Sequence, residues 1–276
     1  MQFEIKNQVF GQGRPKICVP LVGRTQEQLV SEAQLAEKSS CEVVEWRVDL
    51  FEEVPNLEAV VTTLSEIREN LPNKLLLVTF RTQAEGGQRD LSLHYYQELY
   101  EAVVATGQVE LLDVELGVAE YLGRGFIQGL KKQGVGIILS YHNFQKTPAD
   151  GELLLKVSVM KQFAADFGKL AVMPHELKDV LRFMNVSVQL AELTELPLVL
   201  ISMGDLGKTT RVSGELIHSV MTFGSLTDSS APGQIPVEEL RQVLDVMHME
   251  KSEWNGKEKN VENQCDSASR TKKDSL

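Results

Sequence analysis

The fold can be inferred from residues 109–144, VELLDVELGVAEYLGRGFIQGLKKQGVGIILSYHNF. At each end of this stretch lies a short run rich in Val, Ile and Leu in which apolar side chains occupy both alternating faces. Such runs are typical of parallel strands that are covered on both faces. Residues 118–133, between the two runs, repeat apolar side chains at helical spacing and predict a helix. Together they form one strand–helix unit of about thirty residues.

The same unit occurs eight times along the chain. Strand-like runs occupy residues 16–23, 41–50, 74–80, 109–116, 135–144, 169–174, 196–204 and 220–226. Segments of helical period occupy residues 25–38, 56–71, 91–106, 118–133, 151–167, 176–193, 209–220 and 237–249. Eight such units in 276 residues predict an α/β protein with a closed (β/α)8 TIM barrel. A doubly wound open sheet is the alternative, but no glycine-rich dinucleotide-binding motif follows the first run.

The two ends of the chain do not fit this repeat. The residues before Lys16 are expected to form a short hairpin that closes the bottom of the barrel. After about Met249 the sequence is polar, mixed in charge and nearly free of aliphatic side chains, which predicts a disordered tail. We therefore predict one catalytic barrel domain over residues 1–249 and a disordered tail over residues 250–276.

Two of the predicted helices begin with capping signals. Thr25 is followed three residues later by Gln28, which is the pattern of a capping box. Asp90 precedes the helical segment that starts at Leu91 and is expected to cap it.

The composition excludes several classes of protein. There are 39 acidic and 28 basic residues, a formal net charge of −11, and this balance argues against a general nucleic-acid or membrane surface. Cys18, Cys41 and Cys265 are odd in number and show no metal-ligand spacing, so neither a disulfide framework nor a zinc site is expected. The N-terminus has no signal-peptide pattern and no run of 18 apolar residues occurs, so we expect a cytoplasmic protein.

Polar residues interrupt the strand-like runs where the carboxyl ends of barrel strands form an active site. Glu45, Arg47 and Asp49 have one parity, so their side chains are expected on one side of the sheet. At corresponding places in the other runs, or in the segments that follow them, stand Thr79, Arg81, Glu85, Ser140, Tyr141, His142, Asn143, Lys169, Met203, Arg211, Ser230 and Gln234.

These residue types suggest a chemistry. Three arginines at one barrel mouth would bind an anion such as a carboxylate. A lysine in an apolar strand, with a histidine one strand away, suggests imine formation with an acid/base partner. The structural alternatives are an ion-pair network of Glu45, Arg47 and Asp49 and a buried salt bridge from Lys169 to an acid. His142 alone could be a structural histidine, and Arg81 with Glu85 could be a surface pair.

Other patterns are set aside. The segment GDLGKT, residues 204–209, has two residues between its glycines where a phosphate-binding loop has four. No cluster of carboxylates or histidines has the spacing of a metal site, so we expect no bound metal.

The residues singled out above lie in strings that resemble one enzyme family, the type I 3-dehydroquinate dehydratases, which are lyases of the shikimate pathway. The strings are EWRVD at 45–49, TFRTQAEGG at 79–87, SYHNFQKTP at 140–148, GKLAVMP at 168–174, MGDLGKTTR at 203–211 and SSAPGQI at 229–235. Their order and spacing fit from about Lys16 to Met249.

The resemblance implies dehydration of 3-dehydroquinate to 3-dehydroshikimate without metal or cofactor. Lys169 would form an imine with the ketone at carbon 3, His142 would act as base and then as acid, and Glu85 would orient the histidine. Arg211 would hold the substrate carboxylate. Without the resemblance, the residues alone favour Arg47 as the ligand of that carboxylate. The remaining implied substrate contacts are Glu45, Arg47, Arg81, Met203, Ser230 and Gln234, of which the last two lie in a loop expected to act as a lid.

Two other functions remain open from the sequence. A class I aldolase would share the buried lysine and the anion site, and a catalytically silent barrel could bind a quinate-like metabolite as a sensor. In each case the partner is a small anionic molecule. We also expect a homodimer formed through outer helices.

Overall fold

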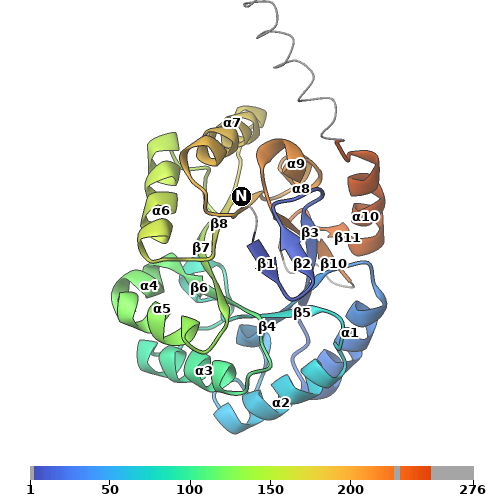
Figure 1. The fold of residues 1–276 in the computed structure, drawn as a ribbon, viewed down its shortest axis with the longest axis vertical. Coiled ribbons are helices and arrows are strands. Elements are labelled where there is room, and N and C mark those ends of the chain that lie inside the picture. The colour runs from blue at the N-terminus through green and yellow to red at the C-terminus, as the bar shows by residue number, and fades with distance from the viewer. Residues whose placement is uncertain (1–2, 227–230, 250–276) are drawn as a thin grey trace, which may run out of the picture.

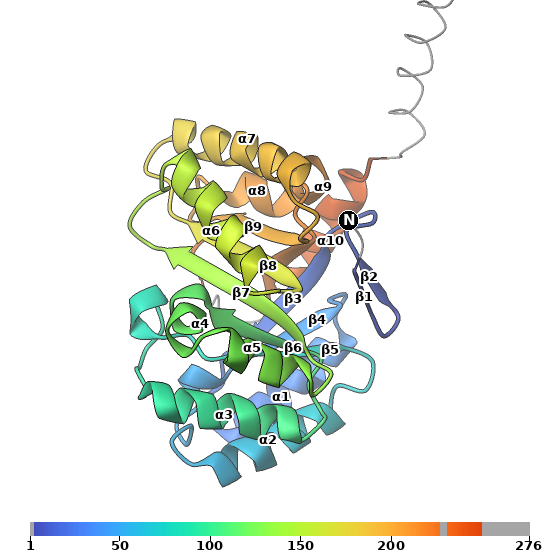
Figure 2. The same ribbon diagram turned by 60° about the vertical axis from the view of Figure 1, so that its left-hand side comes forward.

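Eight parallel strands, β3 to β10, follow one another in chain order around a barrel (Figures 1 and 2). The computed structural model describes residues 3–226 and 231–249. The strands are β3 (Lys16–Leu21), β4 (Val43–Arg47), β5 (Leu75–Thr79), β6 (Leu111–Glu115), β7 (Gly136–Asn143), β8 (Phe167–Val172), β9 (Leu198–Ser202) and β10 (Met221–Ser225). Strand β10 pairs with β3 on one side. On the other side the amide of Val220, just before β10, donates to the carbonyl of Leu198, the first residue of β9, at 2.8 Å. The closed barrel excludes the open-sheet alternative.

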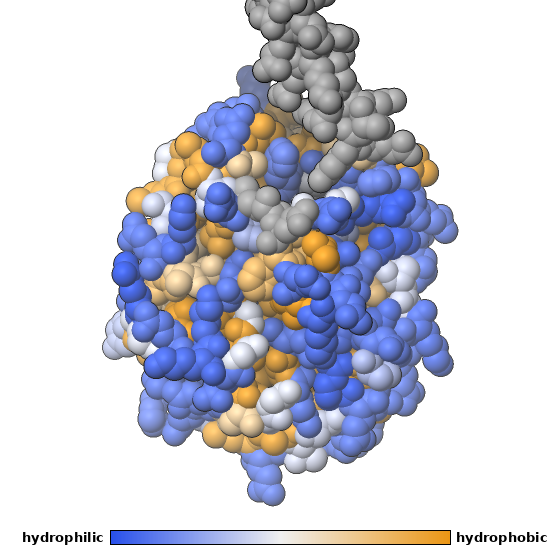
Figure 3. All heavy atoms as spheres, in the orientation of Figure 1, coloured by the Kyte–Doolittle hydropathy of each residue, from blue (hydrophilic) through white to orange (hydrophobic). Residues whose placement is uncertain are grey.

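Helices surround the barrel and follow each strand in turn. They are α1 (Gln26–Lys38), α2 (Leu57–Glu69), α3 (Leu93–Ala105), α4 (Leu116–Leu122), α5 (Arg124–Lys131), α6 (Asp150–Gln162), α7 (Leu177–Leu193), α8 (Lys208–Val212), α9 (Gly214–Ile217) and α10 (Val237–Val246). Two 3-10 turns, η1 (Val48–Leu50) and η2 (Gln83–Glu85), and a short strand, β11 (Ile235–Pro236), follow strands β4, β5 and β10. Hydrophilic side chains predominate on the face seen in Figure 3, with apolar ones interspersed. No helix in the described ranges has the length and apolarity to cross a membrane.

The barrel interior is apolar toward the amino ends of the strands, and a hairpin closes it at that end. Strands β1 (Phe3–Ile5) and β2 (Gln8–Phe10) pair antiparallel, as predicted. The rings of Phe3 and Phe10 meet the ring of Phe167 edge-on, with centroids 4.9 and 5.1 Å apart. Such aromatic contacts add to the burial that fills the barrel. The buried interior side chains of this layer include Cys18, Val43, Leu75, Leu77, Leu111, Ile138, Val199 and Met221.

Several predicted element boundaries need correction. The Thr25–Gln28 capping box is present, but Asp90 does not cap a helix: α3 begins at Leu93 with Ser92 as its cap. The helix predicted over 118–133 is divided at Gly123, whose φ of 83° interrupts it. The helix predicted over 151–167 ends at Gln162, and the next strand starts at Phe167, two residues before the predicted start.

Two further boundaries concern the end of the chain. The helix predicted over 209–220 is present as the two short helices α8 and α9. The tail predicted over residues 250–276 lies outside the described residues.

Candidate active site

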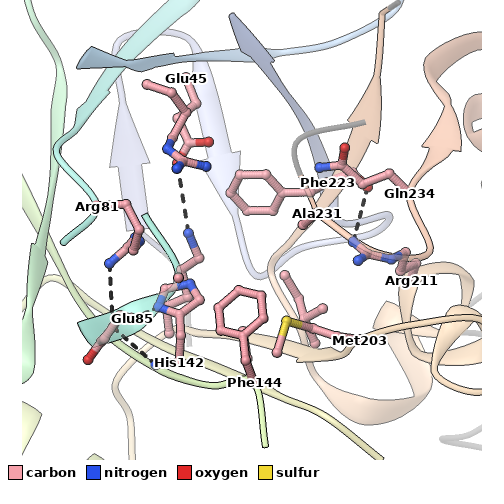
Figure 4. A pocket seen from close by; sticks show the side chains of 15 residues that line it. Glu45, Arg81, Glu85, His142, Phe144, Met203, Arg211, Phe223, Ala231 and Gln234 are labelled. Atoms are coloured by element: carbon pink, nitrogen blue, oxygen red, sulfur yellow. Dashed lines mark hydrogen bonds and ion pairs between the residues drawn. The ribbon is translucent and has the colours of Figure 1, made fainter. Parts of the chain in front are cut away.

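A pocket opens at the carboxyl ends of the barrel strands, where the interior changes from apolar to charged (Figure 4). Inward-facing positions alternate along each strand, so the residues above Val43 on β4 are Glu45 and Arg47. The same parity places Lys169 above Phe167 on β8. The lining consists of Glu45, Arg47, Arg81, Glu85, Gly86, His142, Phe144, Lys169, Ala171, Ile201, Met203, Arg211, Phe223, Ala231 and Gln234.

The structure therefore brings together almost all of the predicted site residues. The catalytic candidates Lys169, His142 and Glu85 line this one pocket. So do the substrate-binding candidates Glu45, Arg47, Arg81, Met203, Arg211 and Gln234. Ser230 lies outside the described residues.

The Lys169 ammonium is buried and has two carboxylates near it. Its Nζ lies 3.0 Å from Asp113 Oδ2 and 3.8 Å from Glu45 Oε1. The same nitrogen stands 4.4 Å from the centre of the Phe223 ring, at a distance typical of a cation–π contact. The buried salt bridge considered as an alternative for this lysine is thus present, and Lys169 itself lines the pocket.

Asp113 is a site residue that the sequence reasoning missed. It is fully buried on β6, where Oδ1 accepts hydrogen bonds from Arg81 at 2.8 Å and from Ser140 at 2.5 Å. Although burial alone would raise the pKa of Asp113, Arg81 and Lys169 hold it well below its usual range. A signal existed, because Asp113 and Glu115 share one parity in VELLDVEL, as Glu45 and Arg47 do in their run.

His142 and Glu85 form a buried pair. Nδ1 of His142 lies 2.8 Å from Glu85 Oε2, and the His142 backbone amide donates to the same oxygen at 3.1 Å. Burial, together with the positive charges of Arg81 and Lys169, lowers the pKa of His142 well below its ordinary value. Burial raises the pKa of Glu85 to about 8, against the opposing effect of Arg81. The imidazole is therefore neutral near pH 7, which is the state that a base requires.

A second residue near this pair was not singled out from the sequence. The Phe144 ring stacks on His142, with centroids 6.4 Å apart and planes 18° apart. Gly86 makes room for it: its φ is 88°, and a Cβ there would stand 2.4 Å from the Phe144 ring. No polar or charged atom marks Phe144, so a search for polar residues at strand ends passes over it.

The three arginines of the pocket differ in their partners. Arg47 Nε and NH2 bind the two oxygens of Asp49 at 2.8 and 2.9 Å. Arg81 is paired with Asp113 at 2.8 Å and with Glu115 at 3.1 Å. These two guanidinium charges are thus neutralised within the protein.

Arg211 has no carboxylate within ion-pair distance among residues 3–226 and 231–249. Its guanidinium donates to the backbone carbonyls of Phe223 at 3.3 Å and Pro232 at 2.9 Å, and its Nε has no hydrogen-bond partner there. Burial lowers the pKa of Arg211 to about 10. A buried cation without a counter-charge is costly, and an anionic ligand would relieve that cost.

The two sides of the pocket therefore differ in character. In Figure 4, Glu45, Arg81, Glu85 and His142 lie on one side and Arg211 on the other. The side chains of Phe144, Phe223 and Met203 lie between them. Within the described ranges, no group of three or more His, Cys, Asp or Glu residues is arranged to hold a metal ion.

Comparisons with known proteins show the family of this chain. The family model described as type I 3-dehydroquinase matches residues 17–251. The chain belongs to this family. A 3-dehydroquinate dehydratase of Syntrophotalea carbinolica is 42% identical over 248 residues, which is 90% of this chain and 98% of the relative. One of Listeria welshimeri is 43% identical over 244 residues, 88% of this chain and 97% of the relative.

Solved structures of the family have the same fold. A type I 3-dehydroquinate dehydratase from Clostridium difficile, in a structure with covalently modified comenic acid, has a TM-score of 0.86 and 36% identity. The alignment covers 90% of this chain and 98% of that one. The Geobacillus kaustophilus enzyme has a TM-score of 0.87 and 31% identity, covering 90% and 96%. Family membership decides against the aldolase alternative.

Proposed function

We propose that this type I 3-dehydroquinase removes water from 3-dehydroquinate to give 3-dehydroshikimate, through an imine on Lys169. The observation that supports this most directly is the composition of one pocket. A buried lysine, a histidine–glutamate pair and an arginine that has no carboxylate partner among the described residues face the same space. Each of the three fits one task of the reaction.

Lys169 supplies the electron sink. The Lys169 ammonium gives one proton to the ketone oxygen, and the free amine attacks carbon 3 of the substrate. The oxygen then leaves as water with a second proton from the nitrogen, and an imine remains that keeps one proton and the positive charge. This cation acidifies the adjacent C–H bond at carbon 2, because the electrons released there can flow toward the nitrogen. The apolar neighbours Ala171 and Phe223 limit access of water to this nitrogen.

His142 moves the proton. When Glu85 is ionised, Nδ1–H donates to its carboxylate, and Nε2 keeps a lone pair for the proton at carbon 2. The imidazolium that forms then protonates the hydroxyl that leaves carbon 1. Elimination yields a conjugated enone after hydrolysis of the imine. General acid–base catalysis of this kind contributes about 10²–10⁴-fold to the rate.

Arg211 fixes the orientation of the substrate. A carboxylate bound there would place the ring between Met203 and Phe144, with its ketone toward Lys169. Glu45, Arg47, Arg81 and the loop with Ser230 and Gln234 are proposed to contact the ring and its hydroxyls.

The test is a spectrophotometric assay for the conjugated product of 3-dehydroquinate, with no metal or cofactor added. Turnover that Lys169→Ala abolishes supports the proposal. Binding without turnover would revive the sensor hypothesis, and turnover that requires an added metal would refute the imine route.

Two further expectations from the sequence stay proposals. We propose that the enzyme acts in the cytoplasm and forms a homodimer through outer helices. Light scattering coupled to size-exclusion chromatography measures the second directly, and a monomeric mass would contradict it.

A further inference from the structure

Among the described residues, the carboxylate closest to the reacting nitrogen belongs to Asp113, and its two oxygens have separate partners. Oδ1 accepts from Arg81 NH2 at 2.8 Å and from Ser140 Oγ at 2.5 Å. Oδ2 accepts from Lys169 Nζ at 3.0 Å. Side chains from three segments of the chain, those of Arg81, Ser140 and Lys169, thus hold this carboxylate in place, and Oδ2 faces the lysine.

The reaction proposed above conserves charge at this nitrogen. An ammonium and a ketone give one protonated imine and one water, so three N–H bonds become one and a single positive charge remains. The imine nitrogen keeps one proton, which needs one acceptor. Asp113 Oδ2 is already at hydrogen-bond distance from that nitrogen.

We propose that the Asp113 carboxylate is the counter-ion of the imine that Lys169 forms, and that it keeps this imine protonated through the elimination. The inference rests on the proposed function. Only the protonated imine is an effective electron sink, so a neutral imine would not acidify the C–H bond at carbon 2.

Asp113 stays ionised during this step for a structural reason. Its bonds to Arg81 and Ser140 are made by the oxygen that does not face Lys169, so they persist when the ammonium becomes an imine. The depressed pKa of this carboxyl, caused by Arg81 and Lys169 in spite of burial, fits a fixed anion and not a group that accepts the proton.

Other charged and titratable groups around the nitrogen are less suited to this role. Glu45 on β4 is farther away, at 3.8 Å, and its Oε1 accepts from Thr79 at 2.8 Å. Glu115 and Glu85 are bound to Arg81, while Arg47 and Arg81 are themselves cations. His142 is neutral by its lowered pKa, and burial raises the pKa of the Cys18 thiol on β3, so neither carries a charge at neutral pH.

A purely structural role for Asp113 would be to neutralise Arg81. Glu115 shares that task, because its Oε1 accepts from Arg81 NH1 at 3.1 Å, and it also binds Thr82. No ion pair joins Glu115 to Lys169 among the described residues. Glu115→Gln is therefore a matched control that removes a buried carboxylate from Arg81 and none from the lysine.

The experiment measures the rate of trapping with cyanoborohydride, which reduces a protonated imine and not a neutral one. Wild-type enzyme, Asp113→Asn, Asp113→Glu and Glu115→Gln are incubated with 3-dehydroshikimate from pH 6 to pH 9, and the reduced adduct is counted by mass spectrometry. An opposite charge at this distance shifts a pKa by about 1–3 units. Trapping of the wild type should stay level, and that of Asp113→Asn should fall at least about ten-fold across this range.

The controls separate the possible outcomes. Asp113→Glu, which keeps the charge, and Glu115→Gln should both retain the level profile. A level profile in folded Asp113→Asn would overturn the counter-ion role while leaving the imine proposal intact. Absence of any adduct in the wild type would instead refute the imine itself.

A measurement on the wild type covers the case in which Asp113→Asn does not fold. With ¹⁵N at the lysine side chains, the nitrogen chemical shift of the adduct distinguishes a protonated from a neutral imine. The unreduced imine should remain protonated up to pH 9. An imine that loses its proton at or below pH 9 would overturn the proposal.

Discussion

Replacing Arg211 by Ala should weaken substrate binding while leaving the protein folded. The guanidinium is buried, its Nε has no partner in the described part of the chain, and its pKa is lowered to about 10 by burial. A substrate carboxylate would be its counter-ion, and a charge-assisted hydrogen bond of this kind is worth about 1.5–3 kcal/mol. The dissociation constant of 3-dehydroshikimate, measured by calorimetry, should therefore rise about 10- to 150-fold. KM for 3-dehydroquinate should rise with it.

Arg47→Ala is the matched comparison, because its guanidinium already has a carboxylate. Removal would leave Asp49 buried without its bidentate partner, which costs about 3–5 kcal/mol of unfolding free energy. For a domain of this size Tm should fall by about 6–20 °C. Unchanged binding in Arg211→Ala, together with weakened binding in a folded Arg47→Ala, would refute the assignment and make Arg47 the carboxylate ligand.

Three further outcomes are expected. Borohydride with substrate should inactivate the enzyme and leave one ring-sized adduct on the peptide that contains Lys169. The control variant Lys161→Ala, changed at an exposed position of α6, should be trapped as the wild type is. An adduct on any other lysine would contradict this prediction. The value of kcat/KM should rise with pH through about 8, because Glu85 loses its proton there while His142 is already neutral. Glu85→Gln should remove this rise. A pH profile that the substitution leaves unchanged would show that the His142–Glu85 pair does not act in catalysis. A chain that ends at Met249 should keep the Tm and turnover of the full chain, since the later residues lack apolar periodicity, and a large loss of either would show that they contribute to the fold.

The barrel was predictable because its signals are local. Each strand-like run carries apolar side chains on both parities, and each following segment has helical period, so residues close in sequence determine both elements. Boundaries were less predictable. Gly123 divides a helix that periodicity alone would continue, and β8 includes Phe167, from the end of a predicted helix, and Gly168, because pairing with β7 and β9 extends the strand.

The position of the site followed from the polar residues that interrupt the strand-like runs, and parity placed Glu45 and Arg47 on one side of the sheet. The pocket contains these two residues and Lys169. The same parity rule, applied to the fourth run, would have found Asp113, which was passed over although its spacing from Glu115 matches that of Glu45 from Arg47. Phe144 carries no such signal, because its place over His142 depends on a turn at Gly86.

By itself, the sequence determined the eight-fold repeat, the inward face of each strand and the residue types at the barrel mouth, because all of these depend on spacing along one segment. Only the tertiary structure decided how the charges pair. The pairing of Arg47 with its near neighbour Asp49 was one of the alternatives open from the sequence, but that Arg211 has no carboxylate partner among the described residues was not. Asp113 and Lys169 are 56 residues apart and meet at 3.0 Å because β6 and β8 both point side chains into one closed barrel. Coulomb interactions depend on distances across that barrel, and these are not set by order along the chain.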